Sequence, residues 1–119
     1  MRKGVKYEDY RKIALSLPEV EEAVAYGTPI FKVKGKMMTL RSDEQERETI
    51  VIKISSPLRS SLTESHPNAF FVTPHYEPHP LMLVDLSKVE ADDLRYLLIE
   101  AWKMIAPKRL VVEFESHHT

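Results

Sequence analysis

The segment from Thr49 to Ile54 constrains the fold more than any other part of the sequence. Isoleucine recurs in it at every second position, with Val51 and Lys53 between. Successive side chains of a β-strand point to opposite faces, so the isoleucines share one face while Val51 and Lys53 share the other. A strand of this kind is stable only beside other strands, with its apolar face covered. The chain is therefore expected to build a sheet.

Five further segments are predicted to be strands of that sheet, because each is short, rich in β-branched or aromatic residues, and bounded by Gly, Pro or polar residues. They are residues 20–26, 30–33, 36–41, 69–73 and 81–86. The turn Lys34-Gly35 separates two of them and indicates a β-hairpin. In its first arm Phe31 and Val33 share one face, and Lys32 lies on the other. The polar stretch 42–48 is expected to be a loop.

Three segments are predicted to be helices, because apolar residues recur in them at spacings of three and four. They are residues 7–17, about 55–64 and about 90–106. Pro18 and Pro107 end the first and the last of them. The tail from Leu110 to Glu115 alternates weakly, which suggests an additional strand at the edge of the sheet. Trp102 lies off the main apolar stripe of the last helix, and we place it at the rim of a pocket.

The expected order of elements is α-β-β-β-β-α-β-β-α. Strands joined by short loops pair antiparallel. The fold class is therefore α+β, with an antiparallel sheet of about six strands and helices packed on one side. A chain of 119 residues has the usual size of one domain. We expect a single domain over residues 1–119, with a core at about 7–106 and a C-terminal tail at 107–119.

Composition argues against several classes of protein. The chain has no cysteine, so disulfides, thiolate metal sites and cysteine nucleophiles are ruled out. No apolar run approaches the roughly 20 residues of a membrane helix, and no signal segment is evident. We therefore expect a cytoplasmic protein with no membrane partner. The formal charge of −1 gives no overall attraction to nucleic acid. Positive charge is nevertheless concentrated in the first half, where residues 1–60 carry twelve Lys and Arg against nine Asp and Glu.

The order and spacing of several short motifs resemble the MmcQ/YjbR family of small bacterial proteins. These motifs are Leu17-Pro18-Glu19-Val20-Glu21-Glu22, Tyr26-Gly27-Thr28-Pro29-Ile30-Phe31-Lys32-Val33, Gly35-Lys36-Met37-Met38, Val51-Ile52-Lys53-Ile54 and Glu100-Ala101-Trp102. The resemblance covers about residues 7–106. It implies a fold similar to that of the frataxin homologue CyaY, which is a twisted antiparallel sheet flanked by helices. It also implies a role in DNA binding, with β-hairpins as wings.

Basic residues on or beside neighbouring predicted strands are the candidate nucleic-acid-binding residues. They are Lys32, Lys34, Lys36, Arg41, Lys53 and Arg59. Those that face outward would form a basic stripe, contact phosphates and release counterions. The resemblance favours Lys36 and Lys53, because the family pattern carries lysine at these positions. The alternative is that lysines simply occupy the solvent face of a half-buried sheet, where they discourage edge-to-edge pairing.

Other residues that could carry chemistry have simpler explanations. His66, His75 and His79 lie among prolines, which prevent a helix from aiming two rings at one metal. Asp92 and Asp93 suit the start of a helix, and the remaining acidic groups, Glu21-Glu22 and the stretch 43–46, are expected to be solvated. No serine lies in a nucleophile elbow and no glycine cluster could hold a phosphate. We expect no catalytic residue, no metal and no cofactor.

Two functions from different classes follow from these observations. The leading hypothesis is a non-enzymatic binding module that contacts DNA through the lysine-bearing hairpin face. The alternative is a protein-interaction or small-ligand-binding module with no nucleic-acid role, in which the sheet face and its aromatic residues hold the partner. An enzyme is the third hypothesis, and it would need a convergent polar pocket that spacing in a sequence cannot show.

Overall fold

The computed structural model describes residues 4–25, 27–42 and 48–117. Its elements, in chain order, are α1 (Tyr7–Leu15), β1 (Val20–Ala25), β2 (Thr28–Val33), β3 (Lys36–Ser42), β4 (Thr49–Lys53), α2 (Ser56–Ser65), β5 (Phe70–Phe71), β6 (Leu81–Asp85), a short 3₁₀ helix (Leu86–Lys88), α3 (Ala91–Ile105) and α4 (Lys108–His117). The predicted α+β order is confirmed up to α3, and α4 is an addition to it. Most of the predicted loop 42–48 lies outside the described residues.

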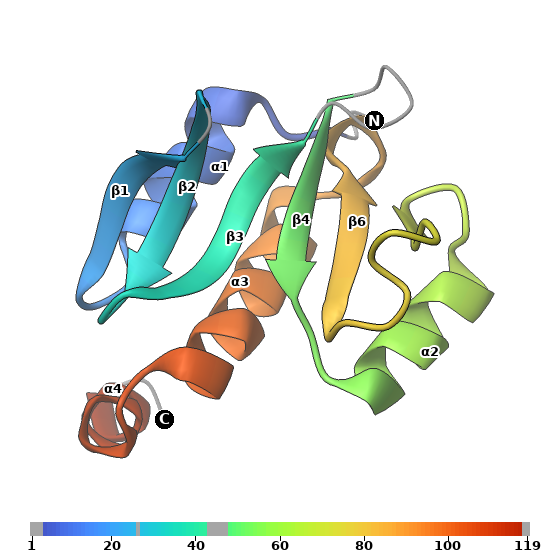
Figure 1. Ribbon diagram of the computed structural model, residues 1–119. Helices are drawn as coiled ribbons and strands as arrows, with labels where there is room; N and C mark the ends of the chain where they lie inside the picture. Colours follow the sequence, from blue (N-terminus) through green and yellow to red (C-terminus); the bar gives the residue numbers. More distant parts are fainter. Residues whose placement is uncertain (1–3, 26, 43–47, 118–119) are drawn as a thin grey trace.

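The six strands form one antiparallel sheet in the order β1-β2-β3-β4-β6-β5 (Figure 1). The first four strands are neighbours in both sequence and space. The chain then leaves the sheet through α2, forms the two-residue β5 at the edge, and returns with β6 beside β4. This crossing brings α2 and the start of α3 to the same edge of the sheet.

The predicted hairpin is formed by β2 and β3. Its two turn residues have positive φ, 50° at Lys34 and 82° at Gly35, as a tight hairpin turn that follows the sheet twist requires. Further along, Phe31 pairs with Thr39 and Lys32 pairs with Met37, which leaves Met38 as the extra residue of a bulge. The bulge lets Met38 as well as Thr39 lie buried.

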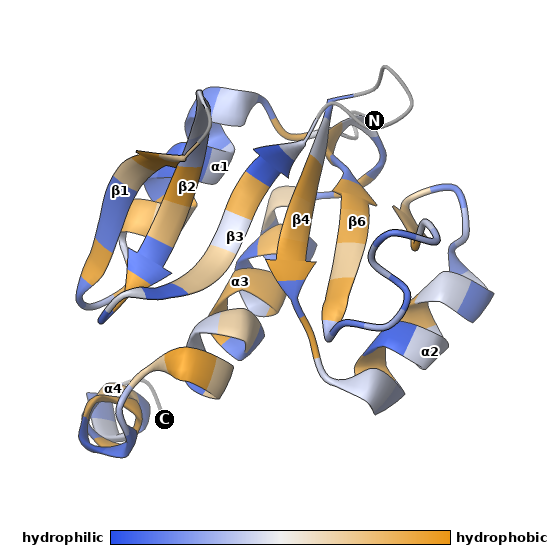
Figure 2. Ribbon diagram, in the orientation of Figure 1, coloured by the Kyte–Doolittle hydropathy of each residue, from blue (hydrophilic) through white to orange (hydrophobic). Residues whose placement is uncertain are grey.

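The helices α1 and α3 cover one face of the sheet (Figure 1). Their apolar stripes meet the residues that alternate inward on the strands, and together these form the core. Figure 2 shows β4 and β6 as largely hydrophobic, as expected of central strands. Both faces of β4 are covered, because Val51 is as fully buried as Ile50 and Ile52.

Trp102 is wholly buried, which corrects its placement at a pocket rim. Its indole Nε1 donates a hydrogen bond of 2.8 Å to the carbonyl of Pro18, in the turn that follows α1. A ring as large as indole extends past the apolar stripe of its helix and can be covered by a second element. Here that element is α4, whose Phe114 ring lies 5.1 Å from the indole ring.

The tail is a helix, and the prediction of an edge strand there is wrong. The carbonyl of Pro107 accepts hydrogen bonds from the backbone of Leu110 and Val111, so the proline that ends α3 also opens α4. Leu110, Val111 and Phe114 lie on the inner side of α4 and pack against the core. Apolar residues spaced one and four apart fit a helical period, and this pattern outweighs the weak alternation.

No helix within the described residues is long and apolar enough to cross a membrane.

Candidate functional site

Arg59 lies on α2 and is committed to contacts within the protein. Its guanidinium donates hydrogen bonds to the carbonyls of His79 (2.8 Å), Leu81 (3.1 Å) and Glu77 (3.2 Å). The Glu77 carboxylate lies 3.7 Å away, and the side chain of Arg59 is 18% exposed. Arg59 thus ties α2 to the connection that precedes β6, and little of its hydrogen-bonding capacity faces solvent.

Lys34 and Arg41 each face a carboxylate. The Lys34 ammonium lies 3.3 Å from Glu19, and the Arg41 guanidinium lies 3.1 Å from Glu48. Arg41 is paired across the sheet with Ile50, so it points toward the helical side, where its guanidinium stacks 5.0 Å from the ring centre of Tyr7. It therefore lies on the side of the sheet opposite to Lys32.

Lys32 and Lys53 share the face of the sheet that α1 and α3 leave open. They alternate with the buried Phe31 and Ile52 on β2 and β4. Both are half-buried and neither forms an ion pair within the described residues. Lys36 is exposed at the start of β3, but its partner in the register is the buried Val33, which places it toward the helical side. The structure therefore brings together two of the six basic residues.

The three histidines do not converge. His75 and His79 belong to the turn-rich connection between β5 and β6, and their rings are exposed. His66 ends α2. No group of three or more metal-ligating side chains occurs in the part of the chain that the structure describes.

The predicted acidic pairs have separate surroundings. Glu22 accepts hydrogen bonds of 2.7 to 3.1 Å from the guanidinium of Arg11, which lowers the pKa of that carboxyl. Asp92 and Asp93 lie in the first turn of α3, as expected. The acidic stretch 43–46 lies outside the described residues.

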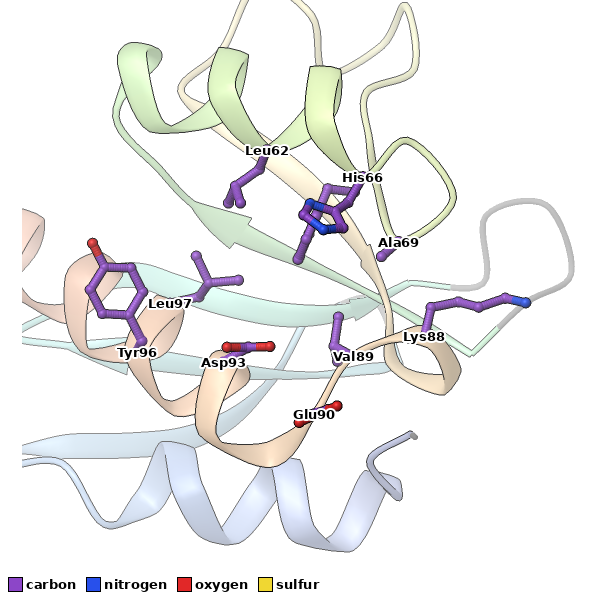
Figure 3. Close-up of a pocket in the computed structure, with 10 residues that line it drawn as sticks. Leu62, His66, Ala69, Lys88, Val89, Glu90, Asp93, Tyr96 and Leu97 are labelled. Atoms are coloured by element: carbon purple, nitrogen blue, oxygen red, sulfur yellow. The ribbon is translucent and has the colours of Figure 1, made fainter. Parts of the chain in front are cut away.

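A cavity of ≈ 320 Å³ lies between α2, β5 and the start of α3 (Figure 3). Its apolar floor consists of Leu62, Ala69, Phe70, Val89 and Leu97. Polar side chains surround the floor: His66 from the end of α2, Lys88, and Glu90, Asp93 and Tyr96 from α3. In Figure 3 the His66 ring lies on the opposite side of the cavity from Asp93 and Glu90, and Lys88 extends away from it.

A second hollow of ≈ 640 Å³ lies on the open face of the sheet. Ile30 and Leu40 form its floor, and Tyr76 from the connection between β5 and β6 lies beside them. We place the candidate site in the first cavity, because polar side chains there approach an apolar floor from two facing helices.

Sequence reasoning did not find the cavity between α2 and α3, although it named several of its residues. Leu62 and Leu97 belong to two of the predicted helices, Asp93 was expected at a helix start, and His66 was expected to lie among prolines. The sequence carries little signal for this cavity. Its residues come together because the chain leaves the sheet after β4, passes through α2 and β5, and returns with β6, and the spacing of residues in the sequence does not reveal this path.

Comparison with known proteins places the chain in a family. The YjbR family model matches residues 15–104. The chain belongs to the YjbR family. Its relatives include Mb2600 of Mycobacterium bovis and Rv2570 of Mycobacterium tuberculosis, each 34% identical over 93 residues that cover 76% of this chain and 72% of the relative. Both are named as uncharacterized proteins, so neither name assigns an activity.

The fold of this YjbR protein is also found in a solved structure. The crystal structure of Deinococcus radiodurans protein DR2400, a DUF419 domain, matches it with a TM-score of 0.73 and 24% identity. The match covers 85% of this chain and 78% of DR2400. It therefore supports the arrangement of sheet and helices described above.

Proposed function

We propose that this YjbR protein is a binding module whose ligand site is the cavity between α2, β5 and α3. The observation that supports this most directly is the composition of the cavity, with five apolar side chains as a floor and polar side chains around it. Sites for small molecules are concave, mainly apolar, and carry a few polar groups that orient the ligand. A volume of ≈ 320 Å³ suits a small organic molecule.

A fragment screen followed by NMR tests this proposal. Fragments that bind in the cavity shift the amide resonances of its two walls, residues 62–70 and 88–97. Ala69 is buried and lines the cavity, so Ala69→Leu places added carbon atoms inside it and abolishes these shifts. The matched control is Ala91→Leu, because Ala91 is exposed and does not line the cavity.

The melting temperatures of both variants establish that they are folded. The proposal is overturned if no fragment shifts the cavity walls at millimolar concentration, or if Ala69→Leu, while folded, leaves the shifts unchanged.

A second candidate function is nucleic-acid binding through the open face of the sheet. One observation favours it: Lys32 and Lys53 share that face, and neither forms an ion pair within the described residues, although Glu21 on β1 lies directly opposite Lys32. Ammonium groups on one face can contact successive phosphates, and such binding weakens as salt rises.

Fluorescence anisotropy with mixed duplex DNA at low and at physiological salt tests this second function. The double variant Lys32→Ala/Lys53→Ala is expected to bind more weakly and with a shallower salt dependence. Lys12→Ala is the control, because Lys12 is an exposed lysine on α1, on the other side of the sheet. Absence of binding at low salt, or equal loss in both variants, excludes the open face as a DNA site.

A further inference from the structure

The ring of His66 shares a hydrogen bond with its neighbour Ser65. The Ser65 hydroxyl donates its single proton to the carbonyl of Ser61, at 2.8 Å. The same oxygen lies 2.9 Å from Nδ1 of His66, and it has no second proton to give. With the Ser65 proton on the Ser61 carbonyl, Nδ1 carries the hydrogen and donates to Ser65. In the neutral imidazole this leaves Nε2 unprotonated, so the ring offers the cavity a hydrogen-bond acceptor.

The opposite side of the cavity also offers acceptors. Glu90 is the N-cap residue of α3, yet its side chain makes no capping hydrogen bond. Asp93 lies in the first turn, and neither carboxylate takes part in an ion pair or a side-chain hydrogen bond within residues 4–25, 27–42 and 48–117. Both carboxylates line the cavity and remain available to a ligand.

Lys88 and Tyr96 are two further polar residues that line the cavity. The Lys88 side chain extends away from the cavity, so its ammonium does not lie between the carboxylates and His66 (Figure 3). Tyr96 lies at the other end of the cavity, and its side chain is 54% exposed. The polar lining of the cavity thus includes an imidazole on one side and two carboxylates on the other.

We propose that the cavity binds a small cationic amine with an apolar body, such as an arylalkylamine. This inference rests on the proposed function and specifies the chemical class of its ligand. An ammonium group is a donor in every direction and carries the charge that two carboxylates complement. The apolar body covers Leu62, Phe70 and Leu97, while the ammonium group lies between Asp93 and His66. An anionic group in the same position meets the like charge of Asp93 and Glu90.

Three probes of matched shape test the ligand class: phenethylamine, phenethyl alcohol and phenylpropionate. Dissociation constants come from NMR titration of the cavity resonances. Phenethylamine is expected to bind at least about 10-fold more tightly than the alcohol, as one charge-assisted hydrogen bond would provide. Phenylpropionate is expected to bind more weakly than the alcohol.

Two carboxylate variants locate the ammonium group. Asp93→Asn is expected to weaken phenethylamine by about 10-fold and to leave phenethyl alcohol nearly unchanged. Asp92→Asn is the matched control, because Asp92 lies one residue away in the same helical turn and does not line the cavity. A general effect of charge near α3 would weaken the amine equally in both variants.

The outcomes separate the two proposals. If the alcohol or the carboxylate binds in the cavity as tightly as the amine, the amine class is overturned while the binding module stands. If Asp92→Asn and Asp93→Asn have the same effect, the placement of the ammonium group is overturned. If none of the probes or the screened fragments binds in the cavity, both proposals fall.

Discussion

The hydroxyl of Tyr10 lies 2.9 Å from Oγ1 of Thr39, and both side chains are fully buried. Thr39 donates its own proton to the carbonyl of Val51, at 2.7 Å. Tyr10 must therefore be the donor to Thr39, and one chain of hydrogen bonds links α1, β3 and β4. Burial of these polar groups is tolerated because each proton has an acceptor.

The direction of this chain predicts unequal effects of its two conservative substitutions. Tyr10→Phe removes the first donor and leaves Thr39 bonded to Val51, so it should lower the free energy of unfolding by about 1 kcal/mol. Thr39→Val leaves the Tyr10 hydroxyl buried without a partner and should lower it by about 2 kcal/mol or more. Urea denaturation measures both. Equal effects would contradict the assigned direction.

The same tyrosine predicts a loss of stability in alkali. Burial raises the pKa of Tyr10 far above its ordinary value, because the charged tyrosinate would lie in an apolar interior. The unfolded chain loses this proton near pH 10 whereas the folded chain keeps it. The contribution of Tyr10 is thus complete below about pH 10 and declines as the pH rises further. Between about pH 9 and 11, which is one unit on either side of the ordinary tyrosine pKa, the urea midpoint of Tyr10→Phe should fall less steeply than that of the unmodified protein. Tyr96 is exposed, so Tyr96→Phe should follow the unmodified protein.

Arg59 predicts a stability effect unrelated to binding. Arg59→Met removes the donors to three carbonyls of the connection before β6 while keeping an apolar stem on α2. We expect a loss of about 2 kcal/mol in the free energy of unfolding, because hydrogen bonds from a charged group are stronger than neutral ones. Arg95→Met is the matched control, since Arg95 is exposed and forms no ion pair within the described residues. If the two variants are equally stable, Arg59 does not hold the connection.

The contact between Phe114 and Trp102 predicts a spectroscopic effect. Trp102 is the single tryptophan of the chain, so its emission reports its own surroundings. Phe114→Ala removes the α4 ring that covers the indole and should shift the emission to longer wavelength in the folded protein. Val112 is 58% exposed on α4, so Val112→Ala should leave the emission unchanged. An unshifted spectrum in Phe114→Ala would show that other groups shield the indole.

The strands and the first three helices were predictable because their signals are local. Alternation at Ile50 and Ile52 and the turn Lys34-Gly35 depend on neighbours in the sequence, and the structure confirms both. In α4 the two kinds of periodicity conflict over a short segment. The helical pattern prevails, and it is supported by the contact of Phe114 with Trp102 on another helix, which the sequence pattern does not report.

The candidate site was less predictable for the same reason. The six basic residues were grouped by nearness in predicted strands, but alternation and the bulge at Met38 decide which face each one meets. Their ion pairs depend on carboxylates such as Glu19 and Glu48, whose positions follow from the folded register. Whether the basic residues bind DNA stays a prediction. The cavity beside α3 required the full topology, because α2 reaches it only after the chain leaves the sheet.

The shallow seating of α2 has a consequence for how a ligand would enter. No residue of α2 is fully buried, and the helix is held mainly by Leu58, Leu62 and the contacts of Arg59. Segments with few buried contacts open locally at a lower free energy than the whole domain. Amide hydrogens of α2 should therefore exchange with solvent well before those of β4 and β6. The wall of the cavity that α2 forms can therefore open locally and admit a ligand while the sheet remains folded.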